Sequence, residues 1–156
     1  MPRIEIFTEV NAPVELVFDL ARDVNLHEKS MAHTNEKAVA GRTSGKVEEG
    51  DQITWEATHL GVRQRLISHI TVVKPPHFFA DEMVSGAFKS FTHEHFFEFG
   101  DGVTTMRDLF VYESPWGILG AIADQLFLAA YMRRLLEKRN SLLKITAEEL
   151  NSRRSL

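Results

Sequence analysis

The stretch SFTHEHFFEFGDGVTTMRD, residues 90–108, decides the predicted fold because two alternating runs flank a tight-turn signal. Asp101-Gly102 between two such runs favours a two-residue type I′ hairpin, in which both loop residues take positive φ angles. With these two residues as the loop, Gly100 pairs with Val103, and counting outward fixes every other pair. The stretch therefore predicts two antiparallel strands in a defined register.

One side of this predicted hairpin is largely apolar and is expected to face the interior. Side chains alternate with period two along a strand, so ten residues of the two strands share this side. They are Phe91, His93, His95, Phe97, Phe99, Thr104, Met106, Asp108, Phe110 and Tyr112. In this register His95 lies directly opposite Asp108, and His93 lies opposite Phe110. Both histidines are therefore expected to point inward, with a carboxylate across from His95.

Outside the hairpin, the chain is expected to form five further strands. They are predicted at residues 3–10, 33–49, 51–59, 62–73 and 77–84, of which 33–49 is poorly patterned. Leu60-Gly61 can turn the chain between two of them. Pro75-Pro76 interrupts continuous pairing, because proline donates no ladder hydrogen bond. The succession of strands predicts an antiparallel meander.

Helical patterns lie at both ends of this meander. Pro13 suits the first position of a short helix, and a second short helix is expected over residues 25–31. After Pro115 the period changes to that of a helix running from about Gly120 to Leu150. Its apolar stripe comprises Leu119, Ile122, Leu126, Ala129, Met132, Leu136 and Leu143. Together these elements predict an α+β fold: a curved antiparallel sheet of about six or seven strands wrapped around a long C-terminal helix, with two short helices after the first strand.

The composition is typical of one globular domain spanning residues 1–156. There is no cysteine, which excludes disulfides and thiolate metal ligands, and the net charge of −4 gives no reason to expect nucleic acid. The start of the chain has no signal-peptide core. The apolar run at residues 126–132 is too short for stable membrane insertion. We expect a cytoplasmic monomer or homodimer.

Several short patterns along the chain resemble the START-like or SRPBCC superfamily, near its polyketide cyclase/dehydrase grouping. They are Ala12-Pro13-x-Glu15-x-Val17-Phe18, Gly50-Asp51-x-x-Thr54-Trp55, Pro76-x-x-Phe79-x-Asp81, Gly86-x-Phe88, Phe91-x-His93-x-His95-x-Phe97, Asp101-Gly102-x-Thr104-x-Met106-x-Asp108, Tyr112 and Pro115-x-Gly117-x-Leu119-Gly120. The resemblance implies the helix-grip fold, with a cavity between sheet and C-terminal helix. It implies no single activity, because the superfamily contains lipid carriers, hormone receptors and cyclases.

The candidate ligand-binding residues lie mainly on the inward side of the hairpin. They are Trp55, His59, Phe91, His93, His95, Phe97, Met106, Asp108, Phe110 and Tyr112. The first hypothesis is a binder of a small hydrophobic molecule (a lipid, polyketide or isoprenoid-like compound), whose polar head these polar groups orient. The second is a cyclase/dehydrase-type enzyme with His95 and Asp108 as acid–base groups. The third is a regulatory partner protein whose cavity is only structural.

A metal site is an alternative on the same residues, since two histidines and Asp108 have the composition of a metal triad, with His59 as the other conceivable ligand. Such a site needs ligand atoms converging at about 2.0–2.2 Å from the ion. Residues on two adjacent strands lack a third converging wall, so no metal and no other cofactor is expected. The favoured interpretation is a histidine–aspartate pair inside an apolar cavity.

Overall fold

The computed structural model describes residues 1–114, 122 and 127–154 of the 156-residue chain. Its strands are β1 (Arg3–Val10), β2 (Lys37–Gly41), β3 (Gln52–His59), β4 (Val62–Lys74), β5 (Phe78–Ser85), β6 (Ser90–Gly100) and β7 (Val103–Glu113). Its helices are α1 (Val14–Ala21), α2 (Val24–Ser30), the one-turn helix η1 (Ala32–Thr34) and α4 (Ala129–Arg154). None of the helices in these ranges is long and apolar enough to cross a membrane.

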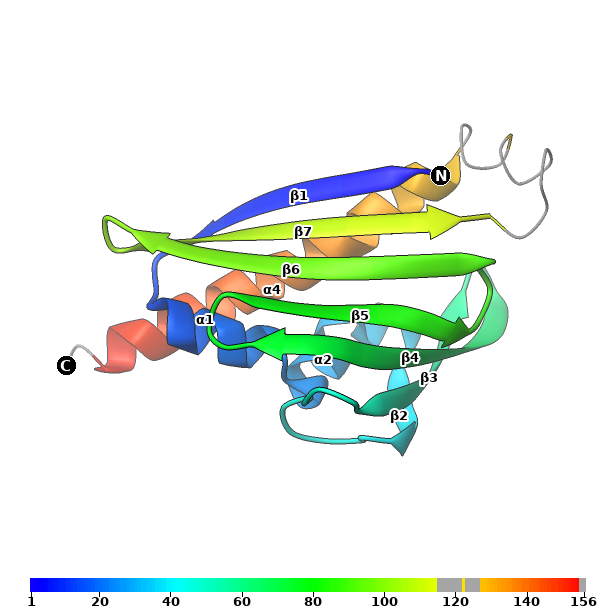
Figure 1. Cartoon of the computed structure of the whole chain (residues 1–156), viewed down its shortest axis with the longest axis horizontal. Coiled ribbons are helices and arrows are strands. Elements are labelled where there is room, and N and C mark those ends of the chain that lie inside the picture. The colour runs from blue at the N-terminus through cyan, green and yellow to red at the C-terminus, as the bar shows by residue number, and fades with distance from the viewer. Residues whose placement is uncertain (115–121, 123–126, 155–156) are drawn as a thin grey trace.

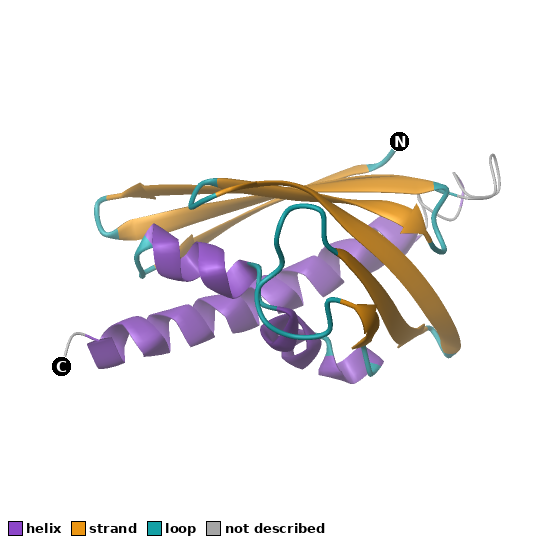
Figure 2. Ribbon diagram, turned by 60° about the horizontal axis from the view of Figure 1, so that its bottom comes forward, coloured by secondary structure: helices purple, strands orange, loops and turns teal. Residues whose placement is uncertain are grey.

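The strands form one antiparallel sheet in the order β1-β7-β6-β5-β4-β3-β2, so β1 at the start of the chain joins the last strand. Figure 1 shows this order, with α4 crossing behind the strands. Figure 2 shows that the sheet curves and that the helices lie on its one inner face. The predicted fold class, a curved antiparallel sheet wrapped around a long C-terminal helix, is confirmed.

The register of the β6–β7 hairpin follows the predicted turn. Gly100 pairs with Val103, and Asp101 and Gly102 have φ angles of 55° and 78°. Positive φ at both loop positions is the type I′ geometry that matches the twist of the flanking strands. His95 therefore lies opposite Asp108 as predicted. The local dipeptide has fixed the position of every inward side chain of the hairpin.

The region before β3 differs from its prediction of one strand over residues 33–49. Only Lys37–Gly41 is a strand, preceded by η1 and followed by a loop. Gly41 has a φ of 73°, and a Cβ there would lie 2.0 Å from the Gln52 carbonyl oxygen. The chain leaves the sheet at this glycine, because residues with side chains rarely adopt this conformation.

The predicted helices are present with shifted boundaries. The second short helix is Val24–Ser30, one residue earlier than expected, because Asp23 caps it. The Asp23 side chain accepts hydrogen bonds from the backbone N–H groups of Asn25 and Leu26 at 2.8 and 3.1 Å. At the other end, α4 continues past Leu150 to Arg154. The predicted start of this helix near Gly120 lies outside the described residues.

Helix α1 fills one end of the inner face of the sheet. The Phe18 ring meets Phe79 and Phe97 edge-on, with centroids 5.7 and 5.3 Å apart. The buried cluster there comprises Val10, Ala12, Val14, Leu16, Val17, Phe18, Phe79, Phe97, Met106, Leu143 and Ala147. This end is a packed core, so open space under the sheet lies further along α4.

Candidate functional site

A pocket with a volume of about 380 Å³ lies between the sheet, α2 and α4. Five of the predicted residues line it: Trp55, His59, Phe91, His93 and Phe110. Leu60 and Phe127 also line the pocket and are 67% and 47% exposed, so they mark its mouth. The inward side of the sheet therefore holds a cavity at the end that α1 leaves open.

The other five predicted residues, His95, Phe97, Met106, Asp108 and Tyr112, are buried outside the pocket lining. The sequence predicts these five side chains on the pocket wall, whereas in the structure other side chains cover them. Helix α1 covers the Phe97 and Met106 end of the sheet, and α4 covers Asp108. The ring of Phe88 packs on Tyr112, with centroids 5.0 Å apart. Alternation predicts which side chains point inward, but not which of them a helix then covers.

The resemblance implied a cavity wall on the C-terminal helix, but sequence reasoning named none of the residues that α4 and α2 contribute to it. The lining residues from these helices are His27, Tyr131, Met132, Leu135, Leu136 and Arg139. Met132 and Leu136 belong to the predicted apolar stripe, which could have pointed to them. Arg139 gave no such signal, because an arginine on a long helix is normally exposed. Here it is 7% exposed.

Beneath the pocket, Asp108 is the centre of a buried polar network. Its Oδ1 lies 2.9 Å from His93 Nε2, 3.1 Å from His95 Nδ1 and 3.4 Å from Arg139. Its Oδ2 accepts a hydrogen bond from Asn140 Nδ2 at 2.7 Å. The predicted contact between His95 and Asp108 thus exists, and it is shared with His93 and with two residues of α4.

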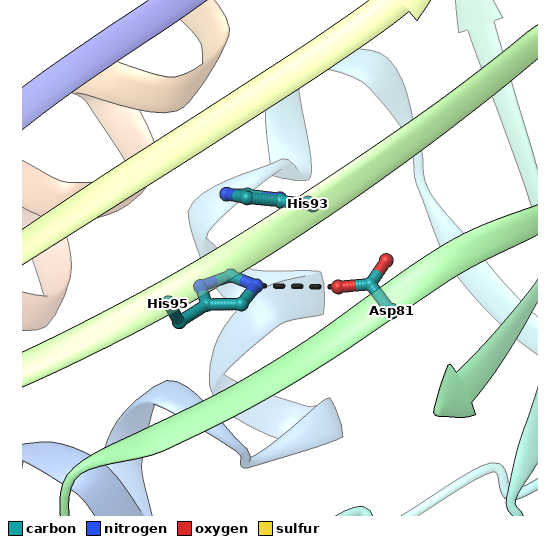
Figure 3. A group of neighbouring side chains, drawn as sticks. All are labelled: Asp81, His93 and His95. Atoms are coloured by element: carbon teal, nitrogen blue, oxygen red, sulfur yellow. Dashed lines mark hydrogen bonds and ion pairs between the residues drawn. The ribbon is translucent and has the colours of Figure 1, made fainter. Parts of the chain in front are cut away.

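A second carboxylate, Asp81, approaches the histidines from β5. Asp81 is the cross-strand partner of His93, and its Oδ1 lies 3.2 Å from His95 Nε2 (Figure 3). Asp81 and His93 both line the pocket. The prediction that a third converging wall is missing is therefore wrong, because β5 supplies it. Asp81 stands two residues after Phe79 on the inward side, but no turn signal fixed its register against β6.

Burial and mutual contacts set the charges of this network. Burial, followed by the neighbouring His95, lowers the pKa of His93 to about 4 despite its hydrogen bond with Asp108. Burial alone would raise the pKa of Asp108, but its contacts with the two histidines and Arg139 hold it well below the usual range. Burial would likewise raise the pKa of Asp81, but it is lowered, mainly through the hydrogen bond with His95. Both carboxylates are therefore ionised at neutral pH.

Two further polar pairs lie on other walls of the pocket. His59 Nδ1 and the Tyr131 hydroxyl are 2.8 Å apart, which joins β3 to α4. Burial lowers the pKa of His59 and raises that of Tyr131, so both are neutral at pH 7. His27 Nε2 lies 2.7 Å from Glu36, and the His27 ring packs on Trp55 at 4.6 Å between centroids. At these two places a ligand would meet polar groups that are already held by a partner.

The sequence family described as "Polyketide cyclase / dehydrase and lipid transport" matches residues 1–148 of the chain. The match spans every element from β1 to most of α4, including the residues of the polar network. No curated protein matches the chain in sequence.

Solved structures from two bacteria and a plant share the fold. A protein of Thermus thermophilus has a TM-score of 0.73 at 18% identity, over 94% of this chain and 99% of its own. A START superfamily protein of Mycobacterium smegmatis has a TM-score of 0.71 at 15% identity, covering 95% and 98%. The major latex-like protein 151 of Panax ginseng has a TM-score of 0.69 at 11% identity, covering 94% and 97%. At such identities the similarity shows the fold alone.

Proposed function

Because the chain belongs to the polyketide cyclase / dehydrase and lipid transport family, we propose that it binds a small hydrophobic molecule in the pocket between its sheet and α4. The observation that carries the proposal is the pocket itself. Its volume of about 380 Å³ falls in the range of small-molecule sites, about 300–1,000 Å³. Apolar side chains form most of its wall: Trp55, Leu66, Phe88, Phe91, Phe110, Leu128, Met132, Leu135 and Leu136.

The polar groups on the wall favour an amphipathic ligand. His93, Asp81 and Arg139 lie together at one place on the wall, because all three belong to the network around Asp108. A hydrocarbon body against the aromatic wall would bring a hydroxyl or carbonyl head to these groups. Lipids, polyketides and isoprenoid-like compounds have this construction.

The alternative function is a cyclase/dehydrase-type reaction with His95 and Asp108 as the acid–base pair. Both side chains are buried behind the pocket wall, at 2% and 0% exposure. A substrate in the pocket would meet His93, Asp81 and Arg139 first, and would not contact His95 or Asp108 directly. We therefore favour binding without reaction.

Filling the pocket tests the proposal. Ala57 lines the pocket, and its neighbour Thr58 points to the outer face. Titration with the neutral fluorophore N-phenyl-1-naphthylamine should show saturable binding to the wild type, weakened about 10-fold or more by Ala57→Phe, since one ring takes the place of ligand. Thr58→Phe should bind as the wild type does. Equal affinity of all three chains would contradict the proposed site.

Native mass spectrometry of the protein as purified distinguishes carrier from enzyme. A carrier releases a co-purified molecule unchanged after incubation. Conversion of that molecule, abolished by His93→Gln, would instead favour the reaction.

A further inference from the structure

We propose that Asp81, His93 and His95 form a binding site for one first-row divalent transition metal ion, of the Zn²⁺ or Fe²⁺ class. One potential ligand atom from each residue lies within 4.8 Å of the other two. Figure 3 shows the Asp81 carboxylate from β5 directed at the edge of His95, with the His93 ring beside it. Two imidazoles and one carboxylate are ligands that these ions accept in proteins.

The position of His95 calls for a cation between it and Asp81. Its Nδ1 lies 3.1 Å from Asp108 Oδ1, and its Nε2 lies 3.2 Å from Asp81 Oδ1. A neutral imidazole carries one N–H, so one of its nitrogens would bring a lone pair close to an anionic oxygen, although Nδ1 itself makes no hydrogen bond. Either a second proton or a metal ion at the Asp81 side removes this repulsion.

The separation of the two atoms suits a metal ion. Two ligands about 2.0–2.2 Å from an ion, at tetrahedral or octahedral angles, stand roughly 3.0–3.5 Å apart. The 3.2 Å between His95 Nε2 and Asp81 Oδ1 lies within this range. The third ligand atom, from His93, lies within 4.8 Å of the ligand atoms of the other two residues.

Asp108 and its partners form the outer contacts that such a site needs. Metal-bound histidines usually donate their other N–H to a carboxylate, which fixes the tautomer. Asp108 stands in this position for the His93 ring, whose Nε2 it contacts at 2.9 Å, and its Oδ1 lies 3.1 Å from His95 Nδ1 without a hydrogen bond between them. With the His93 N–H on Nε2, toward Asp108, the lone pair of His93 Nδ1 is free for an ion, and His95 offers Nε2, which faces Asp81. Asn140 and Arg139 hold Asp108 in place from α4.

The charge balance of the cluster also favours a bound cation. Two carboxylates, Asp81 and Asp108, are offset by one fixed cation, Arg139, which pairs with Asp108. Within the described ranges, the ion-pair contact of Asp81 is the one with His95. Asp81 and His93 line the pocket, so coordination positions on that side stay open to water or to an oxygen of a ligand.

The experiment is a titration of the chelator-treated full chain with Zn²⁺ by calorimetry, followed by Co²⁺ binding monitored by its visible absorption. We expect one Zn²⁺ per chain, and Co²⁺ bands that Zn²⁺ displaces. Asp108→Asn should weaken binding about 10- to 100-fold, and Asp81→Asn and His95→Gln at least as much. Two controls should leave binding unchanged: Glu94→Gln, between the histidines on the outer side of β6, and His33→Gln, an exposed histidine.

Three results would overturn the site. They are the absence of stoichiometric Zn²⁺ binding by the wild type, a Zn²⁺ affinity of Asp81→Asn equal to that of the wild type, or the same loss of Zn²⁺ binding in the two control variants. One further measurement uses the wild type alone, so it does not depend on whether the variants fold. ¹⁵N NMR with excess Zn²⁺ should show a metal-bound nitrogen on His95, and two N–H signals there would mean that a proton takes the place of the metal. The titration needs no organic ligand, so its failure would leave the proposed pocket function untouched.

Discussion

At the scale of single residues, His59 shows how burial sets charge in the pocket. Its ring is half-buried between β3 and α4, beside the Tyr131 hydroxyl, and burial lowers its pKa below 6.5. The folded protein therefore binds fewer protons at this position than the unfolded chain, whose histidine has the ordinary value. The stability that follows is complete above pH 6.5 and is lost as the pH falls through the folded-state pKa.

We expect the His59 ring to titrate below pH 6.5 in an NMR titration, with His59→Gln used to assign its signal. The free energy of unfolding of the wild type, measured in urea, should fall relative to that of His59→Gln between pH 6.5 and the lower midpoint. A midpoint at or above 6.5 would contradict the role of burial.

At the scale of elements, the β6–β7 turn positions the side chains of the network. Asp101 and Gly102 both take positive φ, and a one-residue slip would send the histidines to the outer face. Gly102→Ala places a side chain at a φ of 78° and should lower the free energy of unfolding by about 1–2 kcal/mol. Gly100→Ala is the matched control, because its added Cβ meets nothing within 4 Å and its φ is not positive. Urea denaturation of both variants measures the difference, and equal losses would contradict the cost of a side chain at the positive φ of position 102.

The hairpin is also where sequence reasoning reached furthest. The Asp-Gly dipeptide is a local signal, so the pairing of His95 with Asp108 could be counted without any tertiary information. The register of β5 could not be counted, because β4 and β5 pair with two shifts, and the four residues between β5 and β6 do not fix one register as a two-residue type I′ turn does. Asp81 was missed for that reason. The burial of Arg139 depends on how α4 packs, which no local pattern encodes.

At the scale of the whole molecule, the helices divide the inner face of the sheet into a filled end and an open end. Phe18 of α1 packs in the filled end, whereas Phe91 lines the pocket. This division could not be predicted from alternation, which treats both ends alike. It gives the two ends separable roles, in stability and in binding.

Phe18→Ala should therefore lower the free energy of unfolding by about 3–5 kcal/mol and leave the affinity for N-phenyl-1-naphthylamine within about twofold of wild type, measured where circular dichroism shows both chains folded. Phe91→Leu should weaken the same affinity, because the ring forms part of the wall. If Phe18→Ala weakened probe binding as much as Phe91→Leu does, the two ends would not be separable.

The contacts of Arg139 and Asn140 with Asp108 also determine the position of α4 along its own axis relative to the sheet. The apolar stripe of α4 alone would not fix this position. Leu136 and Leu143 stand seven residues apart, so a helix that slid by two turns would put one leucine in the place of the other. Asp108 does not tolerate the same displacement. If α4 moved by a single turn, about 5.4 Å, so that Leu135 and Leu136 took the places of Arg139 and Asn140, the ionised carboxylate would face apolar side chains. The polar network therefore fixes the axial position of α4 against the sheet. Because α4 forms one wall of the pocket, this axial position also sets the dimensions of the pocket.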